Sequence, residues 1–275
     1  MKRILITGKN GYIGTNLAAF LLRQPSLYAV ETVSLRDRAP DAYDFHGADA
    51  IVHLAAIVHR KETQRNRALY DAVNRDLAIA LAEKAKREGV KQFVFMSTMS
   101  VYGMDEGTVT KDTLPDPKTA YGRSKLEAER AIAALAEEDF TVTVLRAPVV
   151  FGPGAKGNPA RLERLAKHLP FCPTYENRRT AVSIETLCGA IESALRTPRS
   201  CILFPQEPAP VSTCTLLERI QREQGKPVRK TKLLNPLIRM LRACTRVGKK
   251  AFGDLVYQDL TELALSDPYG EEAAR

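Results

Sequence analysis

The sequence predicts an α/β protein with a doubly wound parallel sheet and a smaller C-terminal lobe. In the first half of the chain, short apolar runs with strand character alternate with longer helical patterns, which is typical of a parallel sheet covered on both faces. A glycine-rich loop joins the first strand to the first helix. After Gly154 the alternation loosens and prolines cluster at Pro205, Pro208 and Pro210, which indicates a second, smaller lobe.

The individual elements follow from apolar runs and from helix start and stop signals. Gly89 ends a long helix directly before the strand-like run Gln92-Phe93-Val94-Phe95-Met96. The predicted strands cover residues 2–7, 30–35, 50–56, 92–98 and 141–146, and the predicted helices cover residues 12–23, 65–89, 121–137 and 159–168. We therefore expect a first domain over residues 1–153. Residues 154–275 should form mainly the second lobe, with room for elements that return to the first sheet.

The loop after the first strand reads Gly8-Lys9-Asn10-Gly11-Tyr12-Ile13-Gly14, with the spacing G-x-x-G-x-x-G rather than G-x-G-x-x-G. Between a strand and a helix, Gly8 allows a tight turn, Gly11 lets the backbone approach a pyrophosphate, and Gly14 lets helix and strand pack closely. The amides of the helix N-terminus then face the phosphates. The loop predicts a dinucleotide site that includes Gly8, Asn10, Gly11, Tyr12, Ile13 and Gly14.

Tyr121 and Lys125 are four residues apart in a predicted helix, so they share one helix face. A lysine cation at that spacing favours tyrosinate and lowers the pKa of the phenol below its usual value of about 10. Such a tyrosine can exchange a proton with a sugar hydroxyl or carbonyl near neutral pH, and Thr98 could hold the same oxygen. Without its context the pair would also fit an ordinary surface contact.

The chain of 275 residues carries a formal net charge of +9, which attracts anions such as a nucleotide diphosphate. It has no zinc-ligand spacing and no aromatic-basic pattern of an RNA-binding type, so we expect no nucleic-acid partner. Positive charge is densest over residues 219–250, where leucines at helical spacing predict a basic amphipathic helix. That helix fits a solvated surface, and weak membrane-surface association is the alternative.

The five cysteines show no C-x-x-C pairing, which indicates reduced thiols and no metal site. No apolar run reaches the length of about 18 residues that a membrane span needs. The apolar stretch at the start of the chain is too short for a signal peptide. We therefore expect a cytoplasmic protein.

Together these features resemble the extended short-chain dehydrogenase/reductase family, the NAD-dependent epimerases, dehydratases and reductases of nucleotide sugars. The likeness spans about residues 1–200. Its motifs, in the family's order, are the glycine loop, His53-Leu54-Ala55-Ala56, Val73-Asn74, Ser97-Thr98-Met99-Ser100-Val101-Tyr102-Gly103, Tyr121 with Lys125, Leu145-Arg146-Ala147-Pro148 and Phe151-Gly152-Pro153-Gly154.

More closely, the chain resembles a subgroup found in capsule gene clusters of Gram-positive bacteria. This likeness rests on Val73-Asn74-Arg75-Asp76, Lys156-Gly157-Asn158, Phe204-Pro205-Gln206 and Phe252-Gly253-Asp254-Leu255-Val256-Tyr257, together with the segment from Ser97 to Gly103. Members of the subgroup are often labelled UDP-galactose 4-epimerase. One branch resembles reductases of UDP-4-keto-6-deoxy-N-acetylhexosamines.

The resemblance implies a Rossmann fold that binds NADP(H) or NAD(H), a UDP-sugar substrate, and a homodimer formed through the helix that carries Tyr121. It assigns catalysis to Thr98, Tyr121 and Lys125. It implies further cofactor contacts from Leu54, Ala55, Ala56, Asn74, Ser97, Tyr121, Lys125, Pro148 and Val149. It implies substrate contacts from Thr98, Asn158 and Arg179, and His59 is a further candidate because it follows a strand end.

The choice between the two dinucleotides depends on the end of the second strand, Val33-Ser34-Leu35-Arg36-Asp37. If Arg36 holds the ribose position, its guanidinium, with Lys9 nearby, suits a 2′-phosphate and favours NADP(H). If Asp37 holds it, NAD(H) is favoured. Residues 36–49 are too short for a full extra strand and helix, so Leu35-Arg36-Asp37 could instead match the family's adenine-contacting segment. We favour NADP(H).

Two activities fit the same Thr98, Tyr121 and Lys125. The first is a 4-ketoreductase acting on a UDP-4-keto-6-deoxy-N-acetylhexosamine for surface polysaccharide synthesis, which the basic ribose site and the subgroup resemblance favour. The alternative is a 4-epimerase of UDP-glucose or UDP-GlcNAc. A dehydratase is disfavoured because Met99-Ser100, rather than an acid pair, follows Thr98. A non-catalytic dinucleotide sensor would lack the tyrosine or the lysine, and both are present.

Overall fold

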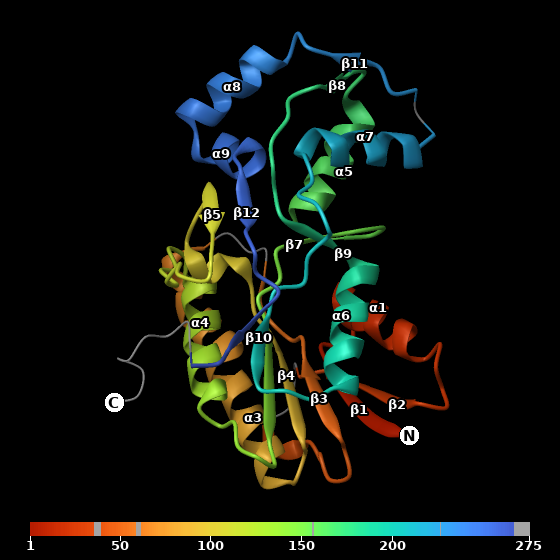
Figure 1. The fold of residues 1–275 in the computed structure, drawn as a ribbon, viewed down its shortest axis with the longest axis vertical. Helices are drawn as coiled ribbons and strands as arrows, with labels where there is room; N and C mark the ends of the chain where they lie inside the picture. The colour runs from red at the N-terminus through yellow and green to blue at the C-terminus, as the bar shows by residue number, and fades with distance from the viewer. Residues whose placement is uncertain (36–39, 59–61, 156, 226, 267–275) are drawn as a thin grey trace.

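The structure is a computed structural model that describes residues 1–35, 40–58, 62–155, 157–225 and 227–266, without the side chains of residues 65, 158 and 159 (Figure 1). Its described part divides into a large sheet-bearing half and a smaller helical lobe (Figure 1). The small lobe lies beyond the carboxyl ends of the parallel strands, the edge at which α/β proteins bind ligands. No described helix is long and apolar enough to span a membrane.

The large half is built on a sheet whose strands, in the described chain, have the order β13-β10-β6-β4-β3-β1-β2. All neighbouring strands are parallel except β13, which runs antiparallel to β10. The strands are β1 (Lys2–Thr7), β2 (Tyr28–Val33), β3 (Ala50–His53), β4 (Gln92–Met96), β6 (Thr141–Leu145), β10 (Cys201–Leu203) and β13 (Glu262–Ala264). This confirms the predicted α/β class with a doubly wound parallel sheet.

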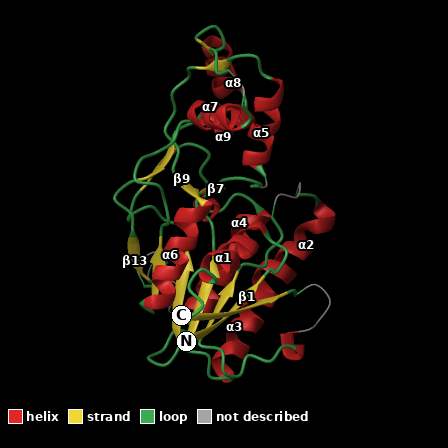
Figure 2. Cartoon of the chain, turned by 90° about the vertical axis from the view of Figure 1, so that its right-hand side faces the viewer, coloured by secondary structure: helices red, strands yellow, loops and turns green. Residues whose placement is uncertain are grey.

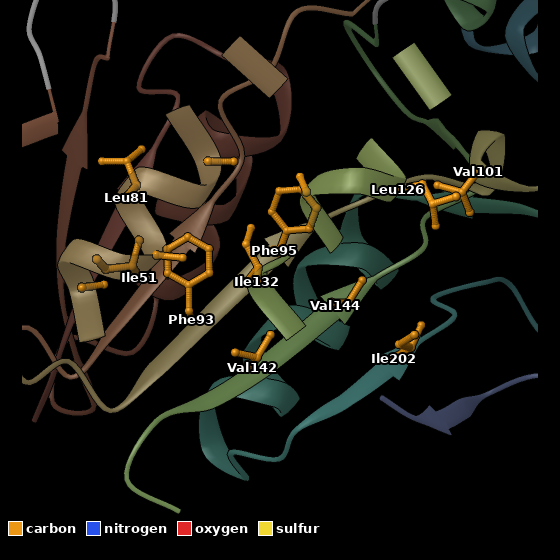
Figure 3. Close-up of a cluster of buried hydrophobic side chains, with 14 of the residues drawn as sticks. Ile51, Leu81, Phe93, Phe95, Val101, Leu126, Ile132, Val142, Val144 and Ile202 are labelled. Carbon is orange, nitrogen blue, oxygen red and sulfur yellow. The ribbon is translucent and has the colours of Figure 1, made fainter. Parts of the chain in front are cut away.

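Helices cover both faces of the sheet (Figures 1 and 2). On one face, α1 (Tyr12–Leu21) and α6 (Ile184–Arg196) pack on the side chains of β1, β3 and β4 that point their way. On the other face, α3 (Leu77–Arg87) and α4 (Ala120–Ala133) pack against alternate residues of the same strands, including Phe93 and Phe95 (Figure 3). Because both faces are buried, the central strands are apolar throughout, as the sequence shows.

The long helix predicted over residues 65–89 contains an irregular segment. It begins with the short η2 (Gln64–Asn66) and α2 (Arg67–Tyr70), and it continues through a π-helical segment, η3 (Asp71–Asp76), into α3. π-helical turns are rare and often occur at functional sites. The helix itself was predicted correctly. The change to the i→i+5 hydrogen bonds of a π-helix was not predicted, because it does not alter the pattern of apolar residues.

A buried ion pair joins α4 to the end of β6. The guanidinium of Arg146 and the carboxylate of Glu129 are both fully buried, with Nη2 and Oε2 2.8 Å apart. Arg146 also donates to the Tyr102 hydroxyl at 2.8 Å, and the Tyr257 hydroxyl donates to the Arg146 carbonyl oxygen at 2.8 Å. Tyr257 ends β12 (Leu255–Tyr257), so the pair also connects the sheet to the returning C-terminal segment.

The small lobe consists of short helices with little sheet. Its helices are α5 (Asn158–His168), α7 (Thr213–Glu223), α8 (Asn235–Cys244) and α9 (Arg246–Phe252), and its two-residue strands β8 (Cys172–Pro173) and β11 (Lys230–Thr231) pair with each other. Two further strand pairs lie between the lobe and the sheet, β5 (Gly107–Val109) with β12 and β7 (Val149–Phe151) with β9 (Ala181–Ser183). The remaining helical turns are η1 (Pro40–Ala42) and η4 (Met99–Tyr102).

Residues 154–275 are not confined to this lobe. The helix α6 and the strands β10 and β13 return to the large half and extend its sheet on one side. On the other side β2 is the edge strand among the described residues, and η1 is the only regular element between β2 and β3 there. The five cysteines are free thiols, as expected, and only Cys244 is exposed.

Candidate active site

The glycine loop closes tightly on itself between β1 and α1. Gly8 has φ +91°, a conformation that favours glycine, and its amide donates to the Val33 carbonyl oxygen at 2.9 Å. A Cβ on Gly14 would lie 2.8 Å from the Gly8 carbonyl oxygen, and one on Gly11 would lie 3.0 Å from it. Larger side chains would therefore push the loop open. The helix α1 begins after Gly11 without a side-chain cap, so its first amides are available to a phosphate.

Thr7 fixes the segment that faces this loop. Its hydroxyl accepts hydrogen bonds from the amides of Leu54 and Ala55 at 3.1 and 3.3 Å, and it contacts Nδ1 of His53 at 3.0 Å. Burial lowers the pKa of His53 to about 3, so the imidazole is neutral and holds the ends of β1 and β3 together. A Cβ on Gly8 would come within 3.2 Å of the Ala55 amide nitrogen. The structure therefore brings the predicted cofactor segment 54–56 against the glycine loop.

The other wall of the predicted cofactor site comes from the ends of β4 and β6. The Ser97 amide donates to the Leu145 carbonyl oxygen at 2.8 Å, and the Met99 amide donates to that of Ala147 at 2.9 Å, which aligns Ser97 with the segment before Pro148 and Val149. The Ser97 hydroxyl is buried, and among the described residues it has no hydrogen-bond partner. A buried polar group without a partner costs free energy, so a ligand that supplies one would be stabilised there. The glycine loop and Ser97 both fit a dinucleotide.

Thr98 and Tyr121 meet at the carboxyl end of β4. The side chain of Thr98 lies next to the phenol of Tyr121, close enough to lower the pKa of the phenol. The Thr98 hydroxyl also caps η4, where it accepts from the Ser100 amide at 3.2 Å. Burial raises the pKa of Tyr121 to about 12, and the Thr98 side chain opposes this rise. In this arrangement the phenol is protonated throughout the neutral range and can act as a proton donor.

Lys125 lies one helical turn after Tyr121, as predicted, but its amine interacts with the sheet. Its Nζ donates to the Met96 carbonyl oxygen at 2.7 Å and lies 4.5 Å from the centre of the Phe95 ring. Burial lowers the pKa of Lys125 to about 7, while Glu129 opposes this shift. The expectation that Lys125 lowers the pKa of Tyr121 is therefore wrong for this arrangement, because desolvation dominates at both groups and favours their neutral forms.

The start of α4 is held by contacts that place Tyr121 beside Thr98. Thr119 caps the helix by accepting from the Gly122 amide at 3.1 Å, and Glu62 accepts from the Ala120 amide at 3.0 Å. A Cβ on Gly122 would lie 2.7 Å from the Ser100 carbonyl oxygen, so the glycine permits close contact between α4 and η4. Glu62 was not among the residues predicted from the sequence. Its partner is a backbone amide 58 residues away, which leaves no pattern in the sequence.

Asn74 belongs to the π-helical segment and is fully buried. Its Oδ1 accepts from the Ile57 amide at 2.7 Å, and its Nδ2 donates to the Ile57 carbonyl oxygen at 3.1 Å. Nδ2 also lies 3.4 Å from the Ser124 hydroxyl of α4. Asn74 therefore ties the loop after β3 to the helix that carries Tyr121.

Some of the remaining predicted residues have described surroundings, and others lie outside the described part of the chain. The hydroxyl of Tyr12 lies close to Gly152, where it is buried and has no hydrogen-bond partner among the described residues. Asn10 is exposed on the loop. Arg179 lies at the junction with the small lobe, where its Nη1 donates to the Gly253 carbonyl oxygen at 2.8 Å. Burial lowers the pKa of Arg179, and Asp105, Asp254 and Glu106 oppose this shift. Arg36, Asp37 and His59 lie outside the described residues, as does the side chain of Asn158.

Residues 4–198 match the model of the NAD dependent epimerase/dehydratase family. This chain belongs to that family. A UDP-glucose 4-epimerase of Vibrio cholerae is 31% identical to it over 255 residues, which cover 82% of this chain and 77% of the relative. The family resemblance inferred from the motifs is confirmed.

Solved structures of the family share the fold. A UDP-glucuronic acid 4-epimerase from Bacillus cereus, in complex with NAD, superposes with a TM-score of 0.70 at 21% identity, covering 97% of this chain and 95% of the other. A dTDP-4-dehydrorhamnose reductase from Bacillus anthracis, in complex with NADP, gives a TM-score of 0.69 at 20% identity, covering 86% of each chain. An epimerase and a reductase thus share the architecture of this chain. The fold therefore does not distinguish the two activities.

Proposed function

We propose that this protein is a nucleotide-sugar 4-ketoreductase that acts on a UDP-4-keto-6-deoxy-N-acetylhexosamine. The observation that carries the proposal is that Thr98 and Tyr121 lie side by side at the carboxyl end of β4, with a phenol that is protonated at neutral pH. A ketone that is reduced to an alcohol needs a proton donor at its oxygen, and a protonated tyrosine is ready for that role.

Each residue of the site has a part in this proposal. Tyr121 gives its proton to the C4 oxygen of the sugar as that oxygen becomes an alkoxide. Thr98 holds the same oxygen through its hydroxyl and so orients the ketone. Lys125, with a pKa of about 7, can take up a proton near neutral pH and stabilise the tyrosinate that Tyr121 leaves behind. Glu62 and Asn74 position the helix α4 and the loop after β3.

The glycine loop, Ser97 and residues 54–56 would hold NADP(H) or NAD(H). When bound, this cofactor supplies the hydride, and the protein contributes binding, orientation and electrostatics. Lys9 lies in the loop beside the end of β2 and would suit the 2′-phosphate of NADP(H). Arg179 at the junction with the small lobe would bind the diphosphate of a UDP-sugar, because a planar guanidinium suits phosphate oxygens. Surface polysaccharide synthesis is the process in which such a reductase would act.

A 4-epimerase is the second candidate, and one observation favours it: the 31% identical relative from Vibrio cholerae is named UDP-glucose 4-epimerase. An epimerase must first remove the proton of a C4 hydroxyl. That step requires a tyrosinate, and the burial that raises the pKa of Tyr121 opposes it. A dehydratase remains disfavoured because Met99 and Ser100 follow Thr98.

The first experiment is to denature the purified protein and identify any released dinucleotide by mass spectrometry. A reductase exchanges its cofactor in every cycle, so we expect an empty site or a partial content of NADP(H). Near-stoichiometric NAD would instead support the epimerase, which regenerates its cofactor and need not release it.

The second experiment supplies UDP-4-keto-6-deoxy-N-acetylhexosamines with NADPH or NADH and follows oxidation of the cofactor. Oxidation coupled to formation of a 4-hydroxy product would support the proposal. Interconversion of UDP-glucose and UDP-galactose without added cofactor, and no reduction of the keto sugar, would overturn it in favour of the epimerase. If neither reaction occurs although the dinucleotide binds, both activities are excluded and a sensor remains.

A further inference from the structure

The small lobe carries an apolar surface at its outer end. Both views place α8 at the end of the molecule farthest from the sheet (Figures 1 and 2). Large apolar side chains around this helix are strongly exposed, and we call them the α8–α9 patch: Leu233 (88%), Leu237 (48%), Met240 (56%), Leu241 (38%) and Val247 (76%). A clustered apolar surface of this kind on a water-soluble fold indicates an interaction site.

The helix α8 has two different faces. Leu237, Met240, Leu241 and Cys244 follow the spacing i, i+3, i+4, i+7, so they share one face, and all are exposed. Ile238 and Arg242, four residues apart, define the face toward the lobe, where Ile238 packs with Tyr175 and Cys214. The helix therefore buries one apolar residue inward and presents a wider apolar face outward.

The orientation of α8 is fixed by contacts on its inner side. Arg242 donates to Glu106 at 2.7 Å, to the Tyr175 hydroxyl at 2.9 Å and to Asp254 at 3.3 Å. The next helix, α9, crosses closely: a Cβ on Gly248 would lie 2.1 Å from the Leu241 carbonyl oxygen. Arg246 of α9 pairs with Asp105 at 2.9 Å. With these anchors in place, α8 cannot turn its apolar face into the lobe without breaking them.

The charge around the patch identifies its partner. Residues 229–250 contain no acidic side chain, and their basic side chains are Arg229, Lys230, Lys232, Arg239, Arg242, Arg246, Lys249 and Lys250. Within the described part of the chain, Lys232, Arg239 and Lys249 are exposed and form no ion pair. Exposed leucine and methionine within a strongly basic segment is a combination that binds the interface of an anionic bilayer.

We infer that the α8–α9 patch docks this protein on an anionic lipid bilayer, with the apolar side chains in the headgroup region and the basic segment 229–250 attracted to the negatively charged surface. The inference does not depend on the proposed reaction. Docking in this orientation places the small lobe on the membrane and the sheet away from it (Figure 1).

The test is flotation of the full-length protein with vesicles of phosphatidylcholine alone or mixed with phosphatidylglycerol. We expect binding to the mixed vesicles that weakens as salt is added, and little binding to phosphatidylcholine. Met240→Glu should lower the partition coefficient about tenfold or more, because it places a carboxylate where an apolar side chain enters the bilayer. The triple variant Lys232→Gln, Arg239→Gln, Lys249→Gln should lower it by about fivefold for each cation removed.

Leu22→Glu is the matched control, since Leu22 (54% exposed) directly follows α1, in the sheet-bearing half, and is about as exposed as Met240. It should bind vesicles like the unchanged protein, and both glutamate variants should keep its thermal unfolding midpoint. Cys244, the one exposed cysteine, gives a second readout: an environment-sensitive fluorophore attached there should shift to the blue on mixed vesicles.

Three results would overturn the inference. The first is no binding of the unchanged protein to mixed vesicles. The second is equal loss of binding in Leu22→Glu and Met240→Glu. The third is a dimer in lipid-free solution that Met240→Glu converts to a monomer, which would assign the patch to a second copy of this chain instead.

Discussion

The sheet-bearing half and the small lobe bury their apolar side chains to different degrees. In the large half, two extended clusters cover the two faces of the sheet, and most of their members are completely buried. In the small lobe the corresponding clusters are small: Ala166, Cys172 and Leu217 form one, and Tyr175, Cys214 and Ile238 form the other. The lobe compensates with polar anchors, above all Arg242, which donates to Tyr175 inside the lobe and to Glu106 and Asp254, the residues just before β5 and β12.

This difference explains why the two regions suit different tasks. The packed sheet holds Thr98, Tyr121 and Lys125 in a fixed arrangement, in which burial rather than charge pairing sets the pKa values of Tyr121 and Lys125. A lobe held by a few contacts can present residues to a variable substrate or, on its outer end, to a surface. Four changes would test this comparison, and we give them from the largest expected effect to the smallest.

Tyr121→Phe should lower turnover by at least about 10²-fold, because it removes the proton donor but leaves the ring that fills the site. The substrate should still bind, since the small lobe is unchanged, so KM should move far less than kcat. Steady-state kinetics with the reductase assay measures both. The control is Tyr28→Phe on the edge strand β2, which removes a hydroxyl that donates to Glu192. This variant should have the turnover of the unchanged protein. A Tyr121→Phe enzyme with normal turnover would exclude the assigned role.

Glu129→Gln should lower the free energy of unfolding by about 3–5 kcal/mol, because it leaves the buried charge of Arg146 without its counterion. Urea denaturation checks this. Glu127 lies two residues earlier on the same helix and pairs with Arg75, and the Glu127 side chain is 43% exposed. Glu127→Gln removes this exposed pair. That control should cost no more than about 1 kcal/mol. Equal losses in the two variants would show that burial does not decide the strength of ion pairs in this half.

The stability of the protein should depend on pH through Lys125. Its pKa is about 7 in the folded state and near 10.5 in the unfolded chain, so between these values the unfolded state binds more protons. The free energy of unfolding should therefore rise with pH from 7 to 10.5, by up to about 1.4 kcal/mol per pH unit from this group. Below pH 7 the full cost of burying the ammonium remains. Lys125→Met should lack this contribution, and identical pH profiles of the two proteins would contradict the burial argument.

Arg242→Met should have the smallest effect, about 1 kcal/mol in the free energy of unfolding, because its contacts are partly exposed. The loss should be confined to the small lobe, so hydrogen exchange should increase in α8 and α9 while the sheet stays protected. Arg239→Met, on the same helix but without an ion pair in the described structure, is the control and should change neither quantity. Loss of protection in the sheet would show that the two regions unfold as one unit.

Most of the large half could be predicted from the sequence, since apolar runs indicated the strands β1, β3, β4 and β6 and the helices α1 and α4 to within a few residues. In the small lobe only α5 was predicted with comparable bounds. The helix α6 was missed although Ser183 caps it and Ile184, Leu187, Cys188 and Ile191 follow helical spacing. The strands β10 and β13 are three residues long, too short for a periodic signal. The glycine loop and the Thr98–Tyr121 pair follow from motifs, whereas Glu62 and the burial that sets both pKa values depend on distant packing.

The π-helical segment before α3 has a consequence for how this chain can change length. A π-helical turn holds one residue more than an α-helical turn, so deletion of one residue between Asp71 and Asp76 would return this segment to regular α-helical spacing. The residues that α3 packs against the sheet, Leu81 and Ala85 among them, would keep their positions, but Asn74 would lose its hydrogen bonds to Ile57. The extra residue therefore serves the placement of Asn74, and a single-residue deletion within this segment should loosen the loop after β3 while the sheet half stays folded.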